Sequence, residues 1–93
     1  PSDALKKIGQ AQSEVDNGNY AKAVELAEGE IEKARKTKND SIISKGLEIL
    51  SASQISLRKY KEAEKSLDDI LQILPESEKF EKAQVYLQYV SLR

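Results

Sequence analysis

A short motif occurs twice in this chain and constrains its fold more than any other feature. Tyr20 is followed three residues later by Ala23, and Tyr60 is followed in the same way by Ala63, so the two copies lie 40 residues apart. Each copy opens a segment in which apolar residues recur at three- and four-residue steps, the spacing of an amphipathic helix. A fixed period of this size indicates a solenoid, in which stacked supersecondary units bury a common core.

The composition fits a single small helical domain. The 93 residues are 39% hydrophobic and 33% charged, and they include only two prolines. Such a chain is too apolar to be disordered, and most of its residues favour helix over strand. A chain of this length buries a thin core. We therefore expect one all-α domain over residues 1–93.

Five segments are expected to be helical. Gly18 can adopt the left-handed conformation that ends a helix, and Pro75 stops the segment before it. Asp40 is expected to cap the third helix, as Ser2 and Ser77 cap the first and the fifth. The helices are expected to form a first hairpin over 3–38, a second hairpin over 41–74 and a terminal helix over 77–93.

These turns and helix starts resemble the tetratricopeptide repeat. In that family the second helix of each unit opens with a Gly-Asp-Tyr-x-x-Ala-like turn, and the unit closes on a proline. The positions that carry the resemblance are Gly18, Tyr20, Ala23, Tyr60, Ala63 and Pro75. The resemblance covers nearly the whole chain and implies a right-handed α-solenoid of antiparallel helix hairpins, with about two and a half repeats and five helices.

The chain departs from the family pattern in several respects. Its period of 40 residues exceeds the usual value of about 34, so it resembles the long-unit members of the family. Arg58 stands in place of the turn glycine, and Ala11 and Ser51 stand where a glycine is common. An early aromatic residue is missing from each first helix. Tyr20 and Tyr60 are expected to pack their rings against the partner helix, which is a structural role.

The resemblance also implies a binding groove. In this family the first helices of successive units line a concave surface that holds a peptide. Here the groove positions would be Leu5, Ile8, Gln12, Val15, Lys45, Glu48, Ala52, Ile55, Lys79, Lys82 and Tyr86. Such a surface could bury an apolar side chain while its lysines orient an acidic or carboxylate group. We therefore expect a protein or peptide partner.

The carboxylate clamp of the chaperone-binding family members is expected to be absent. Its positions on the first helices of the first two units hold Ile8, Gln12 and Ala52, and only Lys79 matches a basic clamp residue. Lys82 could supply a second cation, although a lysine on a helix is more often a solvated charge.

Charge and residue content disfavour other classes of function. A net charge of −1, from 15 basic and 16 acidic residues, gives little attraction for nucleic acid or for a membrane surface. No stretch approaches the roughly 20 apolar residues of a membrane span. The absence of cysteine and histidine excludes disulfides, the usual zinc sites and histidine catalysis. We expect no cofactor and no enzymatic activity, with the compartment open and the cytoplasm favoured.

Several polar and small residues are expected to be structural. Asp68 and Asp69 point about 100° apart on a helix, so they do not form a facing catalytic pair. Single glycines inside helices cost about 1 kcal/mol each relative to alanine, and close helix packing is the simplest explanation for them. These glycines are Gly9, Gly29 and Gly46. A run of carboxylates is expected to lie at the surface and comprises Glu25, Glu28, Glu30 and Glu32.

The expected terminal helix carries two apolar stripes on roughly opposite sides. One contains Phe80, Ala83, Tyr86, Leu87 and Val90, and the other contains Val85, Tyr89 and Leu92. A solenoid normally ends in a polar face. We therefore expect either a chain cut from a longer array, or self-association or partner binding through the second stripe.

Two functional hypotheses remain open at this point. The first is a protein-interaction module that binds a peptide in its groove. The second is a structural or engineered repeat scaffold with no dedicated ligand. The chain contains no Cys, His, Met or Trp, a composition that is uncommon by chance and keeps an engineered or trimmed chain as an alternative. We also expect the chain to be trimmed, because it begins at Pro1 rather than at a methionine.

Overall fold

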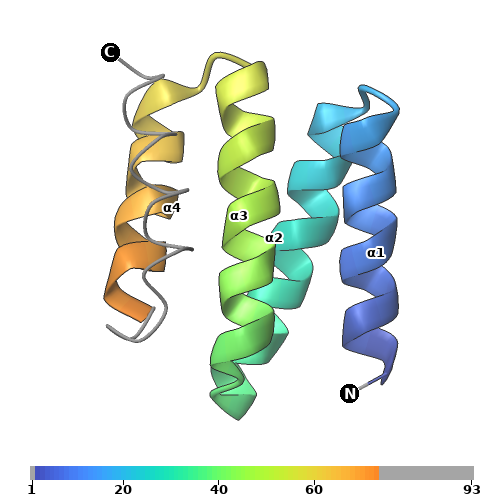
Figure 1. Ribbon diagram of the computed structural model, residues 1–93, viewed down its shortest axis with the longest axis vertical. Helices are drawn as coiled ribbons and strands as arrows, with labels where there is room; N and C mark the ends of the chain where they lie inside the picture. Colours follow the sequence, from blue (N-terminus) through green and yellow to red (C-terminus); the bar gives the residue numbers. More distant parts are fainter. Residues whose placement is uncertain (1, 74–93) are drawn as a thin grey trace.

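The computed structural model describes residues 2–73, which form four α-helices joined by short turns (Figure 1). The helices are α1 Ser2–Asp16, α2 Tyr20–Thr37, α3 Asp40–Ser56 and α4 Tyr60–Ile73. No strand occurs in this part of the chain. The all-α prediction is confirmed, and the expected terminal helix over 77–93 lies outside the described residues.

Successive helices run antiparallel, and α3 occupies the middle of the arrangement (Figure 1). It contacts α1, α2 and α4, and α1 reaches α3 as well as its own partner α2. Because α3 has neighbours on several sides, its buried residues surround the helix instead of forming one stripe. The buried apolar residues of α3 are Ile42, Ile43, Leu47, Ile49 and Leu50.

One turn geometry joins all four helices. A residue with left-handed backbone follows each of the first three helices, at Gly18 with φ 80°, Lys38 with φ 56° and Arg58 with φ 62°. At the first turn the amide of Gly18 donates to the carbonyl of Val15 over 3.0 Å, and that of Asn19 donates to Glu14 over 2.8 Å. This pair of hydrogen bonds is a Schellman motif.

Equivalent bonds recur at the two later turns, where Lys38 and Asn39 donate to the carbonyls of Arg35 and Ala34, and Arg58 and Lys59 donate to those of Ile55 and Gln54. The left-handed residues are spaced 20 positions apart. The same turn therefore recurs every 20 residues, which is half the 40-residue spacing of the sequence motif. The predicted left-handed Gly18 is confirmed, whereas Lys38 and Arg58 adopt this conformation despite their side chains.

The cap predicted for the third helix is wrong by one residue. Asn39 is the N-cap, and its side-chain Oδ1 accepts a hydrogen bond from the amide of Ile42 over 3.3 Å. Asp40 is the first residue of α3. The reason is the preceding turn, because the left-handed residue Lys38 leaves Asn39 as the last residue with non-helical backbone.

The predicted burial of the two motif alanines is confirmed, but the predicted packing of the tyrosine rings is not confirmed for both tyrosines. Ala23 and Ala63 are fully buried, and they allow close approach between helices. Tyr60, expected to pack against its partner helix, is 47% exposed, whereas Tyr20 is half-buried. The two copies of the motif thus share a small buried alanine, and only the first copy encloses its tyrosine substantially.

Two other expectations about packing also need correction. Glu30 was expected at the surface, but it is buried and lies 3.5 Å from the ammonium of Lys33. Only Gly46 is explained by close packing, because a Cβ there would lie 2.6 Å from Cγ1 of Ile31. A Cβ at Gly9 or Gly29 would meet nothing within 4 Å, so no neighbouring helix requires those glycines.

Candidate functional site

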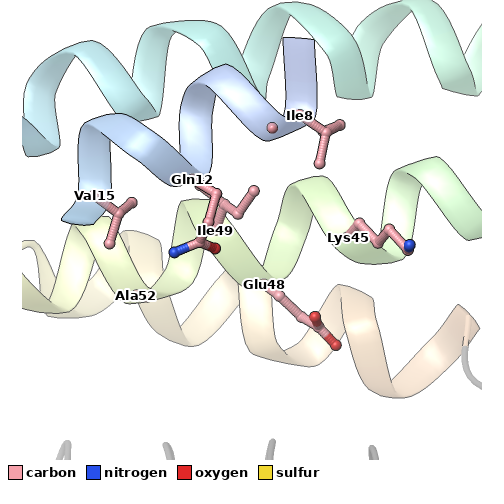
Figure 2. Close-up of a pocket in the computed structure, with 8 residues that line it drawn as sticks. Ile8, Gln12, Val15, Lys45, Glu48, Ile49 and Ala52 are labelled. Atoms are coloured by element: carbon pink, nitrogen blue, oxygen red, sulfur yellow. The ribbon is translucent and has the colours of Figure 1, made fainter. Parts of the chain in front are cut away.

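A groove runs between α1 and α3, the first helices of the two hairpins (Figure 2). It has a volume of ≈ 270 Å³. Among residues 2–73 the lining comes from α1 and α3, and it comprises Ile8, Gly9, Gln12, Val15, Lys45, Glu48, Ile49 and Ala52. Helix α1 contacts both α2 and α3. One side of α1 and one side of α3 are therefore buried in the core, and the neighbouring side of each helix borders the groove.

The floor of the groove is apolar. Ile8 and Ile49 are buried, one from each helix, and Val15 and Ala52 are half-buried nearer the surface. The apolar residues of α1 form a stripe along the helix, and Ile8 and Val15 of this stripe line the groove. A short apolar side chain from a ligand could displace water from this floor, and burial of apolar surface contributes about 25 cal/mol per Å².

The rim of the groove is polar and carries both signs of charge. Gln12 donates a hydrogen bond from Nε2 to Oδ1 of Asp16 over 3.0 Å, within α1. On α3, Lys45 is exposed and Glu48 is half-buried. These two residues lie one helical turn apart, so they occupy the same side of α3. The rim can therefore orient a polar ligand group through one cation, one anion and one amide.

Gly9 is the lining residue that most changes the shape of the groove. It is exposed, lies inside a helix, and leaves open space where a side chain would start. A glycine in a helix interior is destabilising by roughly 0.5–1 kcal/mol relative to alanine, and no close helix contact requires it here. Its effect is to leave a gap in the groove wall beside the buried Ile8.

The structure brings together six of the residues predicted for the groove, which are Ile8, Gln12, Val15, Lys45, Glu48 and Ala52. Leu5, 53% exposed on α1, and Ile55, half-buried on α3, do not line it. Lys79, Lys82 and Tyr86 lie outside the described residues, as do the self-association candidates Val85, Tyr89 and Leu92.

Sequence reasoning missed two lining residues. Gly9 was assigned to close packing, although its position between Ile8 and Gln12 placed it beside the expected groove. Ile49 follows Glu48 directly but is not among the groove positions that the resemblance implies. In the structure Ile49 is 6% exposed and still borders the groove.

Comparison with protein-family models, curated proteins and solved structures finds no match to this chain. Within residues 2–73, no helix is both long enough and apolar enough to cross a membrane. The same residues contain no group of three or more acidic, histidine or cysteine side chains that could hold a metal ion.

Proposed function

We propose that this chain is a tetratricopeptide-like helical repeat that binds a peptide segment of another protein in the groove between α1 and α3. The observation that carries the proposal is that the first helices of the two hairpins contact each other and leave an apolar-floored groove with a polar rim between them. The recurrence of one turn every 20 residues supports the repeat assignment.

The groove indicates the chemistry of the ligand. Ile8 and Ile49 provide a floor for one or two apolar side chains, and the gap at Gly9 allows the ligand to approach α1 closely. Lys45 favours an acidic group on the ligand at one point of the rim. Such a division, in which apolar contact supplies affinity and polar groups supply orientation, is usual for peptide grooves.

The test uses random peptides displayed on phage and selected on the immobilised protein. Enriched peptides are then titrated against Gly9→Leu, in which the new side chain fills the gap. This variant removes a helical glycine, so its free energy of unfolding should rise by roughly 0.5–1 kcal/mol. We expect it to bind the peptides at least about tenfold more weakly, a loss that unfolding cannot explain.

The chain provides a matched control in Gly29→Leu. Gly29 lies in α2, is exposed, and has the same open space above its Cα atom, but it does not line the groove. It should gain similar stability and keep full affinity. Equal affinity of both variants for the enriched peptides would refute the groove as the binding site.

The same peptides also test the role of the charge at the rim of the groove. Lys45→Glu should weaken the binding of acidic peptides without changing the melting temperature, and Lys22→Glu, an exposed position on α2, should not. If selection enriches no peptide at all, the alternative of a structural or engineered scaffold with no dedicated ligand is favoured. The equal spacing of the three turns is the observation that fits that alternative.

A further inference from the structure

A second hollow lies between α2 and α4, above the outer side of α3, and has a volume of ≈ 420 Å³. Its floor is formed by the buried side chains of Ile31, Leu47 and Leu50. The polar residues that border it are Glu28, Glu32, Arg35, Gln54, Glu62, Lys65, Ser66 and Asp69. Within residues 2–73 it shares no lining residue with the α1–α3 groove.

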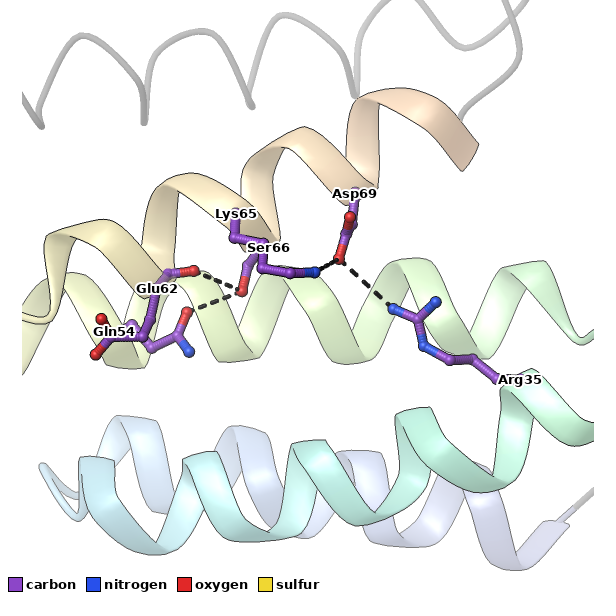
Figure 3. Close-up of polar contacts among 6 residues, drawn as sticks. All are labelled: Arg35, Gln54, Glu62, Lys65, Ser66 and Asp69. Carbon is purple, nitrogen blue, oxygen red and sulfur yellow. Dashed lines mark hydrogen bonds and ion pairs between the residues drawn. The ribbon is translucent and has the colours of Figure 1, made fainter.

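Both cations of this hollow are already engaged at one of its ends (Figure 3). The ammonium of Lys65 lies 3.3 Å from Oδ2 of Asp69, and the guanidinium of Arg35 reaches the same oxygen from α2 over 3.6 Å. Asp69 therefore has two positively charged partners. In the part of the chain that the structure describes, no other cation borders the hollow.

The ion pair also shows the register of the two outer helices. Both α2 and α4 run antiparallel to α3, so they run parallel to each other (Figure 1). Arg35 and Asp69 are 34 positions apart, and so are Glu28 and Glu62. Those two glutamates therefore face each other at one level, about 10 Å along the helices from the ion pair, because a helix rises about 1.5 Å per residue.

Within residues 2–73, neither of the facing glutamates forms an ion pair, and neither does Glu32. Carboxylates on a helix face alone indicate only a solvated surface. Here they flank an apolar floor, where a ligand would exclude water and strengthen their attraction for a cation.

We propose that the hollow between α2 and α4 binds a cationic amphipathic segment of a partner protein. Apolar side chains of the segment cover Ile31, Leu47 and Leu50, and a lysine or arginine lies between Glu28 and Glu62. The charge of the lining determines this choice, because among the described residues four carboxylates face two cations. The α1–α3 groove, with one residue of each sign, has no such preference, so the two surfaces select different partners.

The test uses a synthetic helix-forming peptide of leucine and lysine, titrated at low salt by fluorescence anisotropy. The double variant Glu28→Gln with Glu62→Gln removes the facing charges at almost constant shape. It should bind the peptide roughly tenfold more weakly. The control Glu14→Gln with Glu64→Gln changes the net charge equally, at residues that do not line the hollow, and should lose less than about twofold.

Two further peptides separate apolar contact from charge. Replacing every lysine by glutamate should abolish binding, and replacing every leucine by serine should weaken it at least about tenfold. Equal losses in the two double variants would overturn the proposal, since net charge alone would then explain binding. The proposal would also fail if the serine peptide bound as tightly as the leucine peptide, because the hollow would then hold only a cation. Thermal melting of both double variants checks that they are folded.

Discussion

Arg35 of α2 and Asp69 of α4 are joined across the outer side of α3, with 3.6 Å between the guanidinium Nη2 and the carboxylate Oδ2 (Figure 3). The relative exposures of their side chains are 52% and 23%, so water screens the pair in part. Lys65 shares the same oxygen over 3.3 Å. The contact links two helices of different hairpins that meet each other much less than they meet α3.

A double-mutant cycle measures how much this pair stabilises the fold. With Arg35→Gln and Asp69→Asn, separately and together, we expect a coupling free energy of about 0.2–1 kcal/mol, the range of partly exposed pairs. The coupling should fall at high salt because the charges are accessible to ions. Urea unfolding at two salt concentrations gives the value. A coupling that does not change with salt would contradict this interpretation.

Gly46 is the helical glycine that close packing between α2 and α3 requires. A Cβ at this position would lie 2.6 Å from Cγ1 of Ile31, which is itself buried. Gly46→Ala should therefore lower the free energy of unfolding by about 1–3 kcal/mol through overpacking, although alanine is the better helix former. Gly29→Ala, with open space around it, should raise it by up to about 1 kcal/mol. Denaturant unfolding of both variants measures whether the free energy of unfolding falls in Gly46→Ala and rises in Gly29→Ala. A stabilised Gly46→Ala would show that α2 and α3 can separate without cost.

The helix boundaries could be predicted because their signals are local. Gly18 breaks the chain between α1 and α2, and periodicity identifies the buried Ala23 and Ala63. Burial that depends on neighbouring helices could not be predicted in this way. Glu30 lies on a charged run of the sequence but is covered in the fold, and Tyr60 occupies the position of a packing tyrosine but is 47% exposed.

In the candidate sites too, some features could be predicted from the sequence, and others depend on how the helices pack. The resemblance to a known repeat implies Ile8, Val15 and Ala52 as groove positions, and the structure brings these residues to one groove. Its use as a binding site remains a prediction. The hollow between α2 and α4 was not anticipated, because the register that aligns Glu28 with Glu62 depends on how two helices pack against a third.

The left-handed residues of the later turns carry a measurable strain. Lys38 and Arg58 have positive φ, which costs a residue with a Cβ roughly 1–2 kcal/mol relative to glycine. Arg58→Gly should therefore stabilise the protein by about 1 kcal/mol, and Gly18→Ala should destabilise it by a similar amount. As a control, Glu64→Gly at an exposed position in the interior of α4 should destabilise by about 1 kcal/mol. Thermal and urea unfolding test all three, and a destabilised Arg58→Gly would show that the arginine side chain contributes more than the strain costs.

The buried contact between α3 and α4 offers a test of polar satisfaction in the core. The hydroxyl of Ser66 lies 2.9 Å from Oε1 of Gln54 and 3.1 Å from the carbonyl of Glu62 (Figure 3), and both Ser66 and Gln54 are buried. Ser66→Ala leaves the Gln54 amide without this partner. We expect a loss of about 1–3 kcal/mol, the cost of an unsatisfied buried polar group.

Replacing both partners should cost less than replacing one. In Ser66→Ala with Gln54→Leu, no polar group is left unpaired, and the added apolar surface lies beside Leu50 and Leu47. We expect the double variant to be more stable than Ser66→Ala alone, which urea unfolding of the single and double variants can measure. A double variant less stable than Ser66→Ala would contradict this prediction. It would show that the shape of the Gln54 side chain contributes more to stability at this contact than its hydrogen bond does.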